Sequence, residues 1–183
     1  MAEERILPIS VVDDRPVLTV EQMHEIGNVF AKRVFTDNRV APKLQASKLR
    51  ICFEYYDERW GGKETSITID FSRNPVEFHL GVCDIKPEVT MRMHAYTAHR
   101  FFMQKLNMMI AVAKGEIKVK GPLNRAMRML PSIKPGFDIY KDVLKELGYH
   151  ELLKYPKDKR EKTQEEERET FILPHQAKEE GNA

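Results

Sequence analysis

Three histidines, His79, His94 and His99, are the residues of this chain best suited to acid–base or metal chemistry. A zinc site would need a carboxylate or a further histidine at suitable spacing, and the chain has neither an HExxH nor an HxH sequence. It also has no GxSxG, no GxGxxG and no phosphate-binding loop. The sequence therefore nominates no catalytic residue, no metal ligand and no cofactor, and we expect the protein not to be an enzyme.

Methionine is unusually frequent, since nine occur in the chain and seven of these lie between Met91 and Met129. Its unbranched, polarizable side chain can line a cavity that accepts ligands of several shapes. A single methionine is more often an ordinary core residue. The methionines as a group, beside the aromatic pair Phe101 and Phe102, fit the wall of an apolar binding cavity as well as they fit an ordinary packed core.

Basic residues are concentrated between Lys114 and Lys145, where eight Lys and Arg stand against three Asp and Glu. The formal net charge of the whole chain, +2, is too small to indicate nucleic acid as a partner. A local basic patch suits an anionic membrane surface, a CoA phosphate or a fatty carboxylate, although a solvated face is the commoner use of such a run. The candidate head-group or membrane contacts are Lys118, Lys120, Arg125 and Arg128.

The two cysteines, Cys52 and Cys83, lie far apart and predict neither a disulfide framework nor a zinc site. The start of the chain, MAEERILPISVV, has acidic residues where a signal peptide has basic ones, and no apolar run approaches the about 20 residues of a membrane span. The final residues, EEGNA, are not a peroxisomal address. We therefore expect a soluble, cytoplasmic protein.

The elements that must position these residues follow from hydrophobic periodicity. A helix is expected from Thr19 to about Asp37, because Thr19 and Gln22 can form a capping box and apolar residues follow at helical spacing. Strands are expected over 49–58, 66–71, 76–83 and 89–94, where apolar and polar residues alternate. Their short connections favour an antiparallel meander with one apolar and one wetted face.

The second half of the chain returns to a helical period. One or two helices are expected over 96–113, with Asn107 as a cap, and a fifth strand over 116–120. Pro131 and Pro135 should separate a short helix after Gly121–Pro122 from another over about 138–147. Beyond these, residues 154–170 hold twelve charged residues and cannot pack alone, and FILP (171–174) is a short apolar tag.

This order of elements resembles the sterol carrier protein family, the type-two sterol-binding domain, over roughly residues 17–148. The most telling stretch is PEVTMRMHAYTAHRFFMQKLNMMIAVAKGEIKVKGPLNRAMRMLP, residues 87–131. There the family shows a strand, a helix with buried aromatic residues, a short helix, a strand of alternating lysines and apolar residues, and a Leu/Ala/Met helix. The chain departs from the family at Glu116, at the HAYTAH cap and at Pro122, and none of these departures alters the apolar pattern.

The resemblance implies an α/β fold of the α+β kind: a five-stranded, mostly antiparallel sheet, helices covering one face, and an apolar tunnel between them. It implies a fatty acid, fatty acyl-CoA, isoprenoid or sterol-like ligand, held without chemistry. We expect an extended segment at 1–16, a lipid-binding domain at 17–150 and a charged, helical or disordered tail at 151–183. The candidate apolar lining consists of Phe71, Phe78, Leu80, Met91, Met93, Phe101, Phe102, Leu106, Met109, Met127, Leu130, Ile133 and Phe137.

Two other functions stay open at this stage. The first is a non-catalytic accessory module with a packed core, whose charged tail and FILP tag recruit a partner. The second is an enzyme acting on lipid-like substrates, in which the same fold has acquired chemistry. The sequence leaves a homodimer open as well, and it does not identify the ligand.

Overall fold

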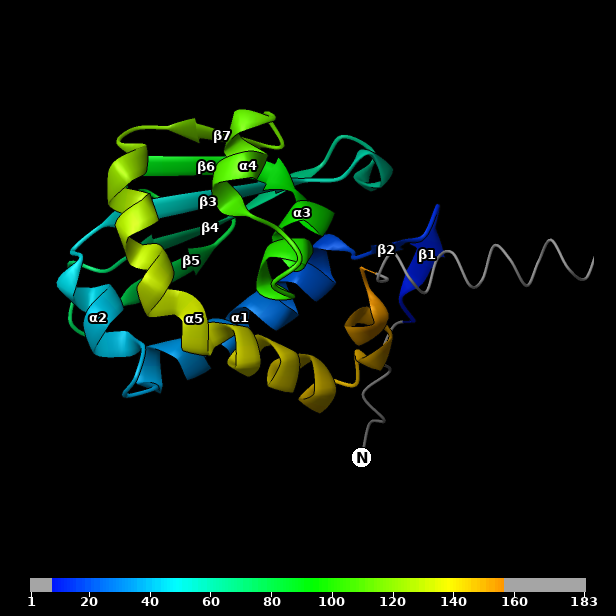
Figure 1. The fold of residues 1–183 in the computed structure, drawn as a ribbon, viewed down its shortest axis with the longest axis horizontal. Helices are drawn as coiled ribbons and strands as arrows, with labels where there is room; N and C mark the ends of the chain where they lie inside the picture. Colours follow the sequence, from blue (N-terminus) through cyan, green and yellow to red (C-terminus); the bar gives the residue numbers. More distant parts are fainter. Residues whose placement is uncertain (1–7, 157–183) are drawn as a thin grey trace, which may run out of the picture.

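The computed structural model describes residues 8–156, which form a five-stranded sheet with helices on one of its faces (Figure 1). The α/β fold with a covered sheet face, which the sequence predicts, is confirmed. Most of the predicted charged tail, with the FILP tag, lies outside the described residues. Within residues 8–156, no helix is both long and apolar enough to cross a membrane.

A small hairpin precedes the first helix. Its strands are β1 (Ser10–Val12) and β2 (Arg15–Val17), and they pair antiparallel. Asp13 and Asp14 between them both have positive φ, which is the conformation that a tight two-residue hairpin turn requires. The segment that was expected to be extended therefore folds back on itself.

The sheet has the strand order β5-β4-β3-β6-β7. Its strands are β3 (Arg50–Tyr56), β4 (Glu64–Asp70), β5 (Glu77–Leu80), β6 (Val89–His94) and β7 (Ile117–Lys120). The first three form the predicted antiparallel meander, and β7 pairs antiparallel with β6. The sheet is therefore mostly antiparallel, as predicted.

The strand β6 does not continue the meander, so the predicted four-strand meander is wrong at its last step. It pairs with β3 instead, in parallel, with Ile51 opposite Val89. The connection 81–88 can reach about 25 Å, whereas three strand spacings take only about 14 Å. A connection of this length can thus cross two strands, and as a result His79 and His94 lie on strands that do not pair.

Two of the helices begin at the caps that the sequence predicts, Thr19 and Asn107, whereas the short helix over 41–46 was not predicted. The helices are α1 (Val20–Thr36), α2 (Ala41–Ala46), α3 (Ala95–Phe102), α4 (Met108–Ala113) and α5 (Leu123–Glu146), with 3-10 turns η1 (Glu58–Trp60) and η2 (His150–Lys154). The predicted capping box is present, because the Gln22 N–H donates to the Thr19 hydroxyl at 3.2 Å and the Thr19 N–H donates to Gln22 at 2.9 Å. Asn107 caps α4 by accepting from the Ile110 N–H at 3.1 Å.

The helix α5 is continuous, so the predicted break at Pro131 and Pro135 is wrong. A proline inside a helix removes one hydrogen bond and crowds the preceding turn, which bends the helix without having to end it. Figure 1 shows α5 changing direction midway along its length. Ala126 before the prolines and Val143 after them are both buried in the same core, and this shared burial holds the two halves together.

The two faces of the sheet differ as the alternation predicts. On the inner face, which the helices cover, Ile51, Met91 and Met93 are each 3% exposed. On the outer face, Arg92 of β6 lies 3.8 Å from Glu54 and also pairs with Glu64. The apolar residues of each strand therefore meet the helices, and the charged ones remain in water.

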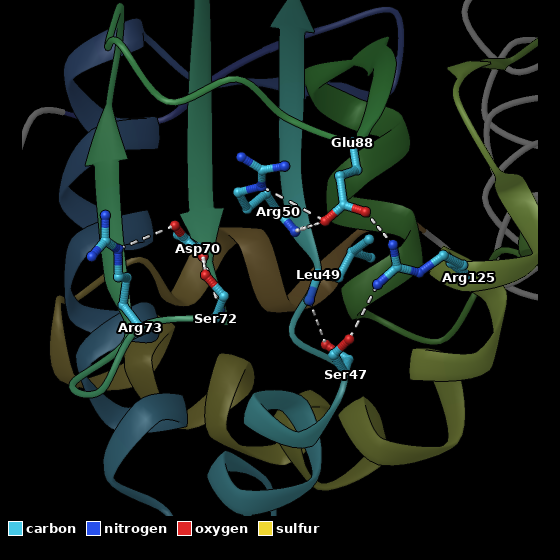
Figure 2. Close-up of polar contacts among 8 residues, drawn as sticks. All are labelled: Ser47, Leu49, Arg50, Asp70, Ser72, Arg73, Glu88 and Arg125. Atoms are coloured by element: carbon cyan, nitrogen blue, oxygen red, sulfur yellow. Dashed lines mark hydrogen bonds and ion pairs between the residues drawn. The ribbon is translucent and has the colours of Figure 1, made fainter.

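One corner of the sheet is tied to α5 through Glu88 (Figure 2). The Glu88 carboxylate accepts hydrogen bonds from Arg125 and, at 3.4 Å, from the Arg50 N–H, while Arg125 also donates to the Ser47 carbonyl at 3.3 Å. Gly121 passes close to the same corner, with φ +93° and with the site of an added Cβ only 2.1 Å from the Glu88 carbonyl oxygen. Only glycine fits this position.

We expect Gly121→Ala to lower the free energy of unfolding by roughly 3 kcal/mol, because the new methyl group meets backbone and the φ is left-handed. Gly115→Ala is the matched control, since its φ is also positive, at +74°, but nothing lies within 4 Å of the added Cβ. It should lose only about 1 kcal/mol. Urea denaturation measures both values, and equal losses would contradict the close approach at Gly121.

Candidate functional site: an apolar cavity between sheet and helices

An apolar cavity of about 160 Å³ lies between the inner face of the sheet and the helices. Its walls come mainly from α1, α3 and α5 on one side, with Leu44 of α2 and Met108 of α4, and from β3, β4 and β6 on the other. Protein cores contain few voids larger than a water molecule, so a space of this size is not ordinary packing. It is comparable to a cavity of about 150 Å³ that admits one benzene-sized apolar molecule.

Eight of the predicted lining residues lie on the cavity wall. They are Phe71, Met91, Met93, Phe101, Phe102, Met127, Leu130 and Ile133. The strand residues among them point inward by the alternation, and the helical ones belong to the buried sides of α3 and α5. Five of the seven methionines between Met91 and Met129 therefore lie on the wall of one space: Met91, Met93, Met108, Met127 and Met129.

The other five predicted residues do not reach the wall. Phe78 packs edge-on against Phe35, with ring centroids 5.8 Å apart, and Phe137 packs against Phe101 at 5.3 Å. Met109 is 53% exposed on the outer side of α4. Leu80 and Leu106 are half-buried, and neither belongs to the lining. Alternation along a strand and spacing along a helix tell which face a residue is on, but not whether its side chain reaches the cavity.

The helix α1 contributes a large part of the wall, and none of its residues was predicted from the sequence to line a cavity. Its lining residues are Met23, Ile26, Gly27, Phe30, Ala31, Val34 and Phe35. Helical spacing did predict a buried face here. However, the spacing is the same whether that face packs against a solid core or borders a cavity. At Gly27, an added Cβ would lie 2.9 Å from the Ile67 Cδ1, so the helix passes close to β4 at this point.

Aromatic rings join α1, α3 and α5 at one side of the cavity. The Phe30 ring meets Phe102 edge-on with centroids 5.0 Å apart and Tyr140 at 5.7 Å. Phe102 and Tyr140 are stacked at 4.9 Å. Such pairs are each worth about 1 kcal/mol beyond their burial, so the three helices form one connected layer over the sheet.

His99 ties this layer to the end of the described chain. Its Nδ1 lies 2.9 Å from the Tyr140 hydroxyl, and its Nε2 lies 3.1 Å from the Leu152 carbonyl oxygen and 3.0 Å from that of Tyr155. Because carbonyls only accept, Nε2 carries the proton and Nδ1 accepts from the Tyr140 hydroxyl. Leu152 itself is fully buried. Residues 150–156, most of which were expected to belong to the tail, are thus part of the folded core.

The other two histidines do not border the cavity. His79 is exposed on β5. The Nδ1 of His94 accepts from the Tyr96 N–H at 3.0 Å and so caps α3, while its Nε2 lies 3.1 Å from Glu58 and 3.6 Å from Asp57.

The side chains of Asp57, Glu58 and His94 are close enough together to hold a metal ion by distance alone. The His94 ring does not suit one, because Nδ1 is an acceptor and the proton must therefore reside on Nε2. The Asp57 carboxylate is already hydrogen-bonded twice by the Arg59 guanidinium, at 2.7 and 2.8 Å. Burial works against ionisation of Asp57, but the hydrogen bonds from Arg59 outweigh it and its pKa is lowered. We read the group as a helix cap with ion pairs.

The predicted head-group contacts lie in different places. Lys118 and Lys120 are exposed on the outer face of the sheet, opposite the cavity. In the register of β6 and β7, Lys118 lies opposite Arg92. Arg125 is engaged at the sheet corner by Glu88 and Ser47. Arg128 is exposed on α5. The two lysines therefore do not border the cavity, and a head-group contact of Arg128 stays a prediction.

Comparison with known proteins identifies a related family. A family model described as the SCP-2 sterol transfer family matches residues 32–133, more than half of the chain. Sterol Carrier Protein 2 from Yarrowia lipolytica, in its apo form, is 17% identical, with a TM-score of 0.51 over 67% of this chain and 93% of that one. The sterol carrier protein domain 2 of Helicoverpa armigera is 16% identical, with a TM-score of 0.49 over 74% and 94%. At such identities, the structural likeness concerns the fold alone.

A second kind of protein shares a smaller likeness. The stereoselective inverting sec-alkylsulfatase Pisa1 from a Pseudomonas species is 17% identical over 14% of its own length, with a TM-score of 0.40. A likeness of this extent carries no argument about chemistry. Comparison with the curated proteins finds no match.

The position of His99 leads to a pH-dependent stability. Burial lowers the pKa of His99 from an ordinary value of 6.5 to about 4, and the hydrogen bonds to Tyr155 and Leu152 offset only part of this effect. Between these two pH values the unfolded chain binds a proton that the folded chain does not, so stability falls as the pH is lowered through this window. The expected loss in unfolding free energy is on the order of 3 kcal/mol.

Urea denaturation between pH 7 and pH 4 tests this expectation. A His99→Gln variant should be less stable at pH 7 and should lose the part of the pH dependence that His99 contributes. His79→Gln, at an exposed position, is the control and should keep the wild-type dependence. The assignment would be overturned by a His99→Gln variant whose stability changes with pH as steeply as that of the wild type.

Proposed function

Since this chain belongs to the SCP-2 sterol transfer family, we propose that it is a lipid carrier, which holds an apolar ligand in the cavity and transfers it without changing it. The observation that carries the proposal is the cavity itself, whose wall is almost wholly apolar and lies between sheet and helices. Ligand binding would be driven by removal of apolar surface from water, at about 25 cal/mol per Å².

The proposed ligand classes are a fatty acid, a fatty acyl-CoA, an isoprenoid or a sterol-like molecule. The cavity as it stands has room for only part of such a ligand. A longer one would need the wall to adjust, and Met91, Met93 and Met127 on that wall have the flexible side chains that permit it. The polar head of a fatty acyl-CoA would remain outside. We keep the cytoplasm as the proposed location, because Cys52 and Cys83 are free thiols.

The alternative, an accessory module with a packed core, is less well supported. A packed core would not retain a space of about 160 Å³ with an apolar wall built from five helices and three strands. Catalysis on a lipid-like substrate is also less well supported. Among the described residues, no Asp, Glu, Lys, Arg, Ser or Cys lines the cavity, so the wall offers no charged acid or base and no serine or cysteine nucleophile.

Native mass spectrometry of freshly purified protein, before and after solvent extraction, tests the carrier function directly. We expect a bound species of lipid mass that extraction removes and that incubation with fatty acids or sterols restores. A protein whose mass stays that of the chain alone under all these conditions would favour the accessory module.

A cavity-filling variant gives the same test by mutation. Gly27→Leu should place a side chain in the cavity, because the glycine lies on its wall and an added Cβ meets only the side-chain ends of Ile67 and Leu80, which can move aside. It should weaken fatty acid binding by about tenfold or more. Lys32→Leu adds the same residue at an exposed position of α1 and is the matched control. Displacement of a fluorescent fatty acid measures the affinity, with circular dichroism to establish folding. Unchanged affinity in a folded Gly27→Leu protein would argue against the cavity as the binding site.

We further propose that α4 contacts the membrane during transfer. Its inner residue Met108 lies on the cavity wall, whereas Met109 and Ile110 are both 53% exposed on its outer side. No acidic residue occurs between Phe102 and Glu116, and Lys114 is exposed at the end of the helix. An apolar pair bordered by positive charge suits the surface of an anionic bilayer.

Replacing both Met109 and Ile110 by serine should slow transfer of a fluorescent lipid to vesicles containing phosphatidylserine by about fivefold or more, because less apolar surface can enter the bilayer. The equilibrium affinity should not change, since neither residue lines the cavity. Val82→Ser removes an even more exposed apolar side chain from the loop after β5 and should transfer at the wild-type rate. Equal transfer rates in all three proteins would exclude this contact.

A further inference from the structure

Three side chains on the cavity wall carry polar atoms: Tyr55 of β3, His99 of α3 and Tyr140 of α5. All three are nearly inaccessible to outside water, with 6%, 2% and 5% of their surface exposed. Polar atoms buried at an apolar wall are costly unless they form hydrogen bonds. The partners of each group therefore tell what a ligand would find there.

His99 and Tyr140 satisfy each other. The Tyr140 hydroxyl donates to Nδ1 of His99, and Nε2 of His99 donates to the Leu152 and Tyr155 carbonyls. The ring of His99 has no hydrogen-bonding atom left for a ligand. The Tyr140 hydroxyl already donates its hydrogen bond to His99, so its oxygen can offer a ligand only a lone pair.

Tyr55 differs from both. No hydrogen bond joins its hydroxyl to any other residue between 8 and 156. Every side-chain polar atom that is fully enclosed within this part of the protein does have a partner. The Tyr55 hydroxyl is therefore not enclosed by protein, and since the residue lies on the cavity wall and is 6% exposed, its hydroxyl opens on the cavity.

The two tyrosines lie near each other in a region without charge. Burial raises the pKa of Tyr140, and the nearby Tyr55 phenol raises it further, so both phenols stay protonated at neutral pH. His99 is neutral there as well, because burial lowers its pKa to about 4. With no Lys or Arg among the described lining residues, nothing on the wall would compensate an ionised carboxylate.

We propose that Tyr55 and Tyr140 form a subsite for a neutral oxygen group, a hydroxyl or a carbonyl, at the buried end of the bound lipid. The Tyr55 hydroxyl donates to the ligand oxygen, and a ligand hydroxyl can in turn donate to the Tyr140 oxygen. A neutral-headed lipid thus enters head first, whereas an ionised fatty acid enters tail first and leaves its carboxylate in water. This assignment rests on the proposed function of the cavity as a lipid-binding site.

The test compares two ligands of equal chain length, dodecanol and dodecanoate, in competition with a fluorescent fatty acid at pH 8. Tyr55→Phe removes only the hydroxyl and should weaken dodecanol binding by about tenfold, the value of one buried hydrogen bond. Its affinity for dodecanoate should stay within about twofold of the wild type, since the carboxylate does not reach the subsite. Tyr56→Phe, the next residue of β3 on the outer face, is the matched control and should change neither affinity.

The thermal stability of the ligand-free variant gives a second readout. A hydroxyl without a partner contributes no hydrogen bond to the fold, so Tyr55→Phe should have an unchanged or higher Tm. A lower Tm would mean that the hydroxyl is bonded within the protein and would overturn the assignment. Equal loss of both ligands, or loss of neither, would overturn the subsite while leaving the carrier function intact. If the wild-type protein bound neither ligand, both the carrier function and the subsite would be overturned.

Discussion

Helices that cover one face of the sheet without filling the space beneath them are the constraint on which the rest of the structure depends. The inner strand residues are apolar and must be covered, and α1, α3 and α5 cover them as a single layer. Contacts among Phe30, Phe102 and Tyr140 join the helices to one another. Large rigid rings keep these backbones at a fixed separation, and a space remains between this layer and the strands.

Polar contacts hold α5 at both ends of that layer. Near its start, Arg125 is bound to Glu88 and to the Ser47 carbonyl at the sheet corner (Figure 2). Farther along, Tyr140 donates to His99, which also binds the backbone around η2. Both groups lie at points where elements distant in the sequence meet, so α5 cannot simply settle onto the sheet and close the cavity.

Keeping the cavity open has an energetic consequence. At about 24 cal/mol per Å³, a void of this size costs the fold on the order of 4 kcal/mol. Single domains are stable by only about 5–15 kcal/mol, so this is a considerable fraction. An apolar ligand would recover part of that loss by filling the space, and binding would then stabilise the protein. The same void that weakens the empty protein is thus what makes it suited to hold a lipid.

The sequence by itself determined the features that depend on neighbouring residues. The Thr19–Gln22 capping box, the Asn107 cap and the alternation along β3 and β6 are set within a few positions of the chain, where periodicity and side-chain chemistry act directly. The order of the elements, with the stretch 87–131, placed the chain beside the right family, and eight of the residues nominated for the lining lie on the cavity wall.

Only the tertiary structure decided the rest, because it depends on contacts between segments far apart in the sequence. The parallel place of β6, the continuity of α5 through two prolines and the lining from α1 all follow from packing against a shared core. Tyr55 shows the difference most clearly. Alternation placed it on the inner face, but that its hydroxyl meets the cavity and bonds to no other residue between 8 and 156 depends on every element around it.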